Sequence, residues 1–312
     1  MPLVMKNDLC AAVDFGTNTA RLLIARRGEH GITPVHVERE IVRLGGGFTD
    51  EKGISDEAWL RGQACLKRFS ALLSRYDVAV VKASATSAVR DAVNGAAFVA
   101  EALTESGITL TVIDGEREAR LTLAGVLSCL DSQPESLVIL DVGGGSTEFV
   151  LSCGGVPVFI RSMPIGVVRL TEGFPSHDEM LARVAAVIGA LEHELSAAGL
   201  TVPADAELVG TAGTATTIAA VHLEMDDYDY RKVNNATVSR TDIGTLFTRL
   251  SDMTLPERLA VKGLEKGRED LIIAGMLILM AVMDRFTFGC MKVSDFGLLE
   301  GLALSGGEYE GK

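Results

Sequence analysis

Short apolar, β-branched runs alternate along the whole chain with segments whose apolar residues recur at helical spacing. Four of the runs predict β-strands, at residues 78–81, 110–113, 137–140 and 207–209. The segments between and after them predict amphipathic helices, since one face of a helix repeats every three to four residues. Strands that alternate with helices predict an α/β fold.

Two of the predicted helices are marked most clearly. The segment 55–76 carries a helical repeat of apolar residues at Trp59, Leu66, Phe69 and Leu73. A second helix is predicted after Ser176, because Ser176 and Glu179 form an S-x-x-E capping box. We expect Gly199 to end it and its apolar face to consist of Leu181, Val184, Ile188, Leu191 and Leu195.

One pattern occurs twice. The segment 12–24 and the segment 139–151 each read as an apolar strand that ends in Asp-x-Gly, a turn of small residues, and a second apolar strand. The two copies begin 127 residues apart. We therefore expect two similar domains, at 1–122 and 123–312, with a hinge near residue 122 and a last helix at about 297–312 that could pack back on the first domain.

The repeated turns have the composition of anion-binding loops. Small residues between two strands leave backbone amides exposed, and such amides can bind phosphate oxygens. Asp14 and Asp141, at the strand ends, are suited to hold a hydrated Mg²⁺ that bridges phosphate oxygens. A hairpin with turn-friendly residues is the alternative for either turn alone, but the duplication favours the phosphate site.

A third glycine-rich turn, Val209–Thr214, follows a strand and opens a predicted helix at 215–222. The amides and the dipole at a helix N-terminus both favour an anion there. The predicted phosphate-binding residues are thus Gly16, Thr17, Asn18, Thr19, Arg21, Gly143, Gly144, Gly145, Ser146, Thr147, Gly210, Thr211, Gly213 and Thr214.

Composition narrows the partners. The 312 residues include 33 glycines, more than the usual share of about 7%, and the formal net charge is −13. This charge argues against nucleic acid and anionic membranes as partners, so a polyanion would need local cations, Mg²⁺ and backbone amides. The longest apolar run, 271–283, is too short to span a bilayer. Five scattered cysteines and no visible signal peptide favour a cytoplasmic protein.

These loops resemble the phosphate loops of the superfamily that contains actin, the heat-shock chaperones and the acetate and sugar kinases. More narrowly, the chain resembles the exopolyphosphatase and guanosine pentaphosphate phosphatase family. The segments that carry this resemblance run in the family's order and cover nearly the whole chain: 85–91, 114–121, 141–148, 163–166 and 294–301. It implies two duplicated actin-like (ribonuclease H-like) domains with an active-site cleft between them, and possible homodimers.

The resemblance also implies roles for single residues. Glu118 would be the catalytic carboxylate that activates water, Glu148 would bind Mg²⁺ or orient water, and Arg90 would contact substrate phosphate. Without the resemblance, Glu118 reads as an ordinary first-turn Glu, and Glu148 as an exposed strand residue. Arg21 could simply cap a strand. Further along, Lys262, Lys266 and Arg268 could form a cationic path for a polyanion or a solvated charged loop.

Two departures from the family pattern bear on substrate. Asp114 stands at the turn before Glu118, where a Ser-Gly turn is more usual, and the all-helical region of longer members is absent from this sequence. We expect an Mg²⁺-dependent hydrolase that removes terminal phosphate from inorganic polyphosphate. Guanosine pentaphosphate is the alternative substrate, and a small-molecule kinase or a non-catalytic regulator that binds nucleotide or polyphosphate are the alternative classes.

Overall fold

The computed structural model of the protein describes residues 9–28, 31–78 and 80–305. The chain divides into two units: residues 1–128 with 298–312 form the first, and residues 129–297 the second. Helix α4 (Gly115–Leu127) runs without a break through residue 122, where the sequence suggested a hinge, and the first unit ends just after it. The chain therefore passes from one unit to the other twice, after Ser128 and after Gly297.

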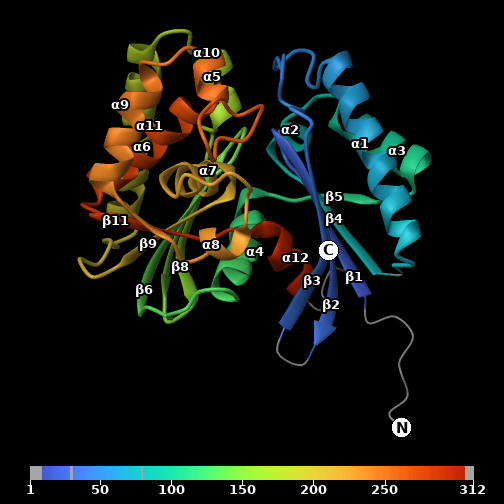
Figure 1. The fold of residues 1–312 in the computed structure, drawn as a ribbon, viewed down its shortest axis with the longest axis horizontal. Helices are drawn as coiled ribbons and strands as arrows, with labels where there is room; N and C mark the ends of the chain where they lie inside the picture. Colours follow the sequence, from blue (N-terminus) through green and yellow to red (C-terminus); the bar gives the residue numbers. More distant parts are fainter. Residues whose placement is uncertain (1–8, 29–30, 79, 306–312) are drawn as a thin grey trace. The chain divides into compact units, whose positions relative to one another are not determined.

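A five-stranded sheet of order β3-β2-β1-β4-β5 forms the centre of the first unit (Figure 1). β1, β2 and β3 are antiparallel neighbours, while β4 runs parallel to β1 and β5 parallel to β4. The strands are β1 (Leu9–Phe15), β2 (Thr19–Gly28), β3 (Gly31–Ile41), β4 (Val80–Ala85) and β5 (Leu110–Val112). The helices are α1 (Asp56–Arg75), α2 (Ser87–Arg90), α3 (Gly95–Ser106), α4 and α12 (Leu298–Leu304).

Alternation along β1 assigns its side chains to two cores, since neighbouring residues of a strand point to opposite faces. Ala11, Val13 and Phe15 pack with residues of α1 and α3. Cys10 and Ala12 belong to a smaller cluster with residues of α4 and α12. The sheet of the first unit is thus covered on both faces, and α12 completes the second cover.

Two cations fix the C-terminal end of α12, where carbonyl groups lack helical partners. Arg27 Nη2 donates to the carbonyl of Ala303 at 3.3 Å. Lys82 Nζ donates to the carbonyl and the hydroxyl of Ser305. Burial, followed by the charge of Arg27, lowers the pKa of Lys82. The expected last helix is therefore real but shorter than 297–312, and residues 306–312 lie outside the described part of the chain.

The second unit repeats this plan. Its sheet has the order β10-β11-β9-β6-β7-β8, in which β8-β7-β6-β9-β11 matches the five strands of the first unit. The strands are β6 (Ser136–Val142), β7 (Thr147–Cys153), β8 (Val156–Met163), β9 (Glu207–Thr211), β10 (Thr237–Ser239) and β11 (Cys290–Val293). The helices are α5 (Val167–Gly173), α6 (His177–Ala197), α7 (Ala212–His222), α8 (Tyr230–Val233), α9 (Arg240–Ser251), α10 (Leu255–Leu259) and α11 (Ile272–Arg285). The predicted α/β fold with a duplicated domain is confirmed.

The marked helices form where the sequence predicted them, with one correction. Ser55 caps α1, and Ser176 and Glu179 make both halves of the capping box of α6. Gly199 follows α6 with a φ of +70°, the left-handed conformation that ends many helices. Leu181, however, is 43% exposed, so the expectation that it joins the packed face is wrong; that face begins at Val184.

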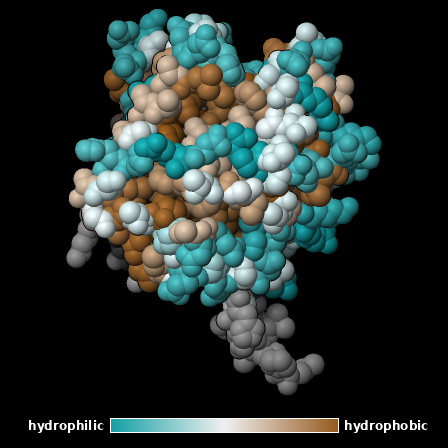
Figure 2. Space-filling model, turned by 90° about the vertical axis from the view of Figure 1, so that its left-hand side faces the viewer, coloured by the Kyte–Doolittle hydropathy of each residue, from teal (hydrophilic) through white to brown (hydrophobic). Residues whose placement is uncertain are grey.

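Apolar side chains are also visible on the surface. On the face shown in Figure 2, brown apolar areas are separated by teal hydrophilic side chains. The large exposed apolar residues of the second unit are Val156, Val158, Leu181, Leu223, Tyr228, Leu255 and Leu259. In the described part of the chain, no helix has the combination of length and hydropathy needed to cross a bilayer; the predicted apolar run lies in α11.

Candidate active site

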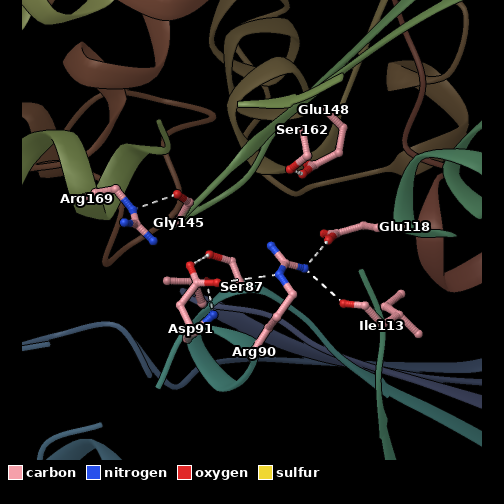
Figure 3. Close-up of polar contacts among 11 residues, drawn as sticks. Ser87, Arg90, Asp91, Ile113, Glu118, Gly145, Glu148, Ser162 and Arg169 are labelled. Atoms are coloured by element: carbon pink, nitrogen blue, oxygen red, sulfur yellow. Dashed lines mark hydrogen bonds and ion pairs between the residues drawn. The ribbon is translucent and has the colours of Figure 1, made fainter. Parts of the chain in front are cut away.

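The glycine loop of the second unit, Gly143–Ser146, joins β6 to β7, and its peptide groups share one orientation. The carbonyls of Gly143 and Gly144 accept from the amides of Val167 and Val168, both at 2.9 Å. The carbonyl of Gly145 accepts from Nε of Arg169 at 3.0 Å (Figure 3). Because the N–H of a trans peptide points opposite to its C=O, the amides of residues 144, 145 and 146 point away from α5.

These three amides have the arrangement that an anion nest requires, and their binding of phosphate stays a prediction. Within the described ranges, none of them donates to an acceptor of the protein. Gly143 N–H closes the turn onto the carbonyl of Ser146 at 3.0 Å. Gly166 makes the arrangement possible, because a Cβ there would lie 2.5 Å from the carbonyl carbon of Gly144. Three parallel N–H donors are suited to the oxygens of a phosphate group.

The first unit has a similar loop at the corresponding position, Gly16–Thr19. Its carbonyls at Thr17 and Asn18 accept from the amides of Gly45 and Arg43, at 2.9 and 2.8 Å. In both units, therefore, backbone amides that follow the third strand of the sheet (β3 or β8) donate to the carbonyls of the loop. The amide of Asn18 points the other way, and Thr17 Oγ1 accepts from the amide of Ala88 at 3.2 Å.

The third predicted loop is the N-terminus of a helix, as expected, but α7 begins at Ala212 and not at 215. Ala212 has a φ of +59°, an unusual conformation for a residue with a side chain. The guanidinium of Arg268 lies so close to Gly213 that a Cβ there would be 2.0 Å from Nη1. Thr214 packs against α11, since a Cβ on Gly275 would lie 2.5 Å from its hydroxyl.

The surroundings of Arg268 favour one of the two interpretations of the basic segment, a cationic path for a polyanion, over a solvated charged loop at this position. Arg268 is 8% exposed and donates to Glu265 at 2.7 Å, so it is not part of a solvated loop. Lys262, in contrast, has a side chain that is 60% exposed and pairs with Asp226. Glu265 offsets part of the positive charge of Arg268, and the position of this guanidinium beside the N-terminus of α7 makes it a candidate phosphate ligand.

The hydroxyls of two predicted phosphate-binding residues have partners within the protein. The Thr147 hydroxyl, fully buried, donates to the carbonyl of Ile165 at 2.6 Å. The Thr211 hydroxyl donates to the carbonyl of Phe296 at 3.1 Å. A hydroxyl has one proton to donate, so in this structure the side-chain protons of Thr147 and Thr211 serve the fold. Ser146 stays a candidate.

The repeated Asp-x-Gly motif places a different partner beside the aspartate in each unit. Asp14 is opposite Arg21 on β2, and Arg21 Nη2 lies 2.9 Å from Asp14 Oδ2. Arg21 therefore forms an ion pair within the sheet. Asp14, which we expected to hold a metal ion, already has a cationic partner. Asp141 is opposite Glu148 on β7.

Asp141 and Glu148 form a candidate magnesium site. Residues opposite each other on neighbouring strands share a face of the sheet, and these two are 9% and 1% exposed. The reading of Glu148 as an exposed strand residue is therefore wrong. No cluster of three or more His, Cys, Asp or Glu side chains suited to a metal occurs among the described residues. Two carboxylates still fit Mg²⁺, which usually keeps several waters and completes its shell with substrate phosphates.

In the first unit, the structure brings Arg90 and Glu118 together (Figure 3). Arg90 Nη1 lies 3.4 Å from Glu118 Oε2 and donates to the carbonyl of Ile113 at 3.0 Å. Its Nε lies 3.5 Å from Asp91 Oδ1, and Ser87 donates to the other oxygen of Asp91 at 3.2 Å. Three fixed contacts thus orient the guanidinium.

Glu118 differs from the ordinary first-turn acid that the sequence left open. Helix α4 begins after Asp114, whose side chain accepts from the amide of Arg117 at 2.7 Å. Glu116, in the same first turn, has a 64% exposed side chain that pairs with Arg120. Glu118 is 8% exposed and faces Arg90. Buried carboxylates with a charged partner occur often at functional sites.

Comparison with known proteins identifies the family. The model of the Ppx/GppA phosphatase family matches residues 23–310. The chain belongs to this family. Among curated relatives, Exopolyphosphatase 2 of Mycobacterium tuberculosis is 36% identical over 313 residues, which cover 95% of this chain and 97% of the relative.

A second curated relative is a longer protein. A bifunctional 3-dehydroquinate synthase/phosphatase of Fusobacterium nucleatum is 32% identical over 317 residues, 97% of this chain and 47% of the relative. This chain thus spans about half the length of that relative.

Solved structures agree with the fold. A Ppx/GppA enzyme of Aquifex aeolicus is 30% identical with a TM-score of 0.77, and the match covers 96% of this chain and 99% of that one. An exopolyphosphatase from Cytophaga hutchinsonii is 29% identical with a TM-score of 0.84, over 94% of this chain and 96% of that one.

Proposed function

We propose that this family member is an Mg²⁺-dependent exopolyphosphatase, which hydrolyses the terminal phosphoanhydride of inorganic polyphosphate and releases orthophosphate. The observation that carries the proposal is the loop Gly143–Ser146. Its three amides are suited to bind phosphate oxygens, and the loop directly joins the two strands that bear Asp141 and Glu148. The full-length match to a relative named as an exopolyphosphatase supports the substrate.

The charge on the substrate sets the main requirement. Phosphoryl transfer needs little covalent help from a protein; it needs neutralised oxygens and a positioned nucleophile. In the second unit, the amides of the loop and the guanidinium group of Arg268 can supply positive charge, and in the first unit Arg90 can do so. When bound at Asp141 and Glu148, Mg²⁺ would neutralise phosphate oxygens and orient the phosphoryl group.

Glu118 is the proposed general base. In the step, a water oxygen bonds to the terminal phosphorus, the bond from that phosphorus to its bridging oxygen breaks, and the proton of the water passes to the Glu118 carboxylate. The shortened polyphosphate leaves with the bridging oxygen. Arg90, held by Ile113 and Asp91, would keep Glu118 oriented and contact a phosphate oxygen with its remaining N–H groups.

Phosphate release from graded polyphosphate lengths, with guanosine pentaphosphate as comparator, tests the substrate. We expect faster release from polyphosphate. Faster release from guanosine pentaphosphate would make that nucleotide the substrate of the same hydrolytic reaction. ATP consumption that requires an acceptor would indicate a kinase. Inactivity on all of them would overturn the proposal in favour of a binding protein.

Glu118→Gln tests the mechanism. Loss of a general base costs about 10² to 10⁴ in rate, so kcat should fall by that factor while the fold is kept. Glu116→Gln is the matched control, because Glu116 lies in the same first turn and is exposed. Equal activity of the two variants would contradict the role of Glu118.

A further inference from the structure

A row of polar side chains crosses the end of the second sheet. β-pairing places Thr211, Asp141, Glu148 and Ser162 opposite one another on β9, β6, β7 and β8. The first three belong to the loops and carboxylates described above. Ser162 is the fourth member, and neither the sequence patterns nor the proposed mechanism gave it a function.

Ser162 makes a direct contact with the buried acid. Its hydroxyl donates to Glu148 Oε1 at 2.7 Å (Figure 3). Glu148 is 1% exposed, and the next residue on its side of β7, Val150, is fully buried and apolar. A carboxylate in such a place needs hydrogen-bond donors, because water cannot reach it freely. The serine therefore holds one carboxylate oxygen of Glu148 in place.

An irregularity in the sheet sets up this contact. The pairing of β7 with β8 shifts by one residue between Leu151 and Ser152, which leaves Val158 as the extra residue of a bulge. Without that shift Glu148 would be opposite Arg161, whose side chain lies on the other face of the sheet in the observed register. Bulges are frequent next to active sites, where they re-aim side chains.

We infer that Ser162 is a positioning residue for the metal site: its hydroxyl holds the Glu148 carboxylate in the orientation that binds a divalent cation. This inference rests on the proposed metal role of Glu148. Hydrogen-bond partners of ligating carboxylates orient the ligand, and their loss weakens metal binding by about 10- to 100-fold.

The chain supplies a matched control. Ser152 lies on β7, is 1% exposed, and its hydroxyl has no hydrogen-bond partner in the described structure. Ser152→Ala therefore removes a buried hydroxyl from the same strand pair without removing a bond to Glu148. Ser162→Thr keeps the hydroxyl and has a residue type that strands favour.

The test measures binding of Mn²⁺, which takes the same oxygen donors as Mg²⁺, to the substrate-free full chain, with free Mn²⁺ followed by electron paramagnetic resonance. Ser162→Ala should bind about 10- to 100-fold more weakly than the unmodified chain, whereas Ser162→Thr and Ser152→Ala should bind nearly normally. Equal affinity of Ser162→Ala and Ser152→Ala, or failure of Ser162→Thr to restore binding, would overturn the inference, as would a chain that binds no Mn²⁺.

Two further readouts separate the explanations. Saturating Mg²⁺ should restore most of the kcat of Ser162→Ala, because the hydroxyl orients a ligand and takes no part in the reaction. Weakened Mn²⁺ binding by this variant in a chain that hydrolyses no polyphosphate would support the inference and contradict the proposed function. If Ser162→Ala does not fold, Ser162→Cys replaces it with the same expected order, since a thiol is a weaker donor.

Discussion

At the scale of single residues, burial and partners separate side chains that look equivalent in the sequence. Glu116 and Glu118 lie in one helical turn, yet the first is solvated and the second is buried against Arg90. Ser146 and Thr147 are adjacent hydroxyls, and only for Thr147 does the structure show a structural acceptor, the Ile165 carbonyl. Residues two apart on a helix do not share a face, which separates Glu116 from Glu118. Adjacent residues at the start of a strand point to opposite sides, which separates Ser146 from Thr147.

This division predicts different effects for the two hydroxyls. Thr147→Val removes the donor to a buried carbonyl, so the free energy of unfolding should fall by about 1–3 kcal/mol. Ser146→Ala removes no hydrogen bond that the structure records and should leave unfolding nearly unchanged while it weakens phosphate binding. Urea unfolding and the KM for polyphosphate give the two readouts. A stable Thr147→Val variant would contradict the structural assignment of that hydroxyl.

At the scale of elements, local patterns were sufficient for most of the fold. The capping box of α6, the Asp-x-Gly turns and the apolar strands depend on residues close in sequence, and they formed near the predicted positions, although the strand expected at 78–81 is β4, which begins at Val80 and ends at Ala85. Side-chain partners that depend on strand register were not predictable. The Asp14–Arg21 pair and the Glu148–Ser162 contact both follow from β-pairing, and one of those registers includes a bulge that no sequence pattern marks.

The capping box gives a test at this scale. Ser176→Ala removes the acceptor for the amide of Glu179, and the loss of such a cap costs about 0.5–2 kcal/mol. The thermal midpoint of the second unit should fall accordingly, as measured by calorimetry. Ser196→Ala, an exposed substitution near the other end of the same helix, is the control and should not lower it. Equal midpoints for the two variants would show that the box contributes nothing.

At the scale of the whole molecule, the first unit is built from two separate segments of the chain, and the second unit lies between them in the sequence. The sequence suggested a boundary near residue 122 and a last helix that could pack back on the first domain; in the structure the boundary follows Ser128, and α12 belongs to the first unit. Sequence patterns left the return of this helix open, because it depends on which apolar face remains uncovered once the sheet of the first unit has formed. Arg268 was ambiguous for the same reason: its contact with Gly213 joins segments far apart in sequence.

The return of α12 predicts a stability effect at a distance along the chain. Leu302 is fully buried between α12 and the sheet of the first unit. Leu302→Ala should cost about 2–5 kcal/mol and unfold the first unit at lower denaturant. Tryptophan fluorescence can follow this, because Trp59, the single tryptophan, lies in α1 of that unit. Leu181→Ala, on the surface of the second unit, should leave the transition unchanged; equal shifts would refute the prediction.

The double passage between the units also bears on how the protein is made. Residues 129–297 are contiguous, so the second unit is complete as soon as it has left the ribosome. The first unit, although synthesised earlier, has one apolar face of its sheet only partly covered, by α4, until residues 298–304 emerge. Its maturation therefore waits for the synthesis of the other unit, and during that interval the nascent chain exposes a surface suited to chaperones.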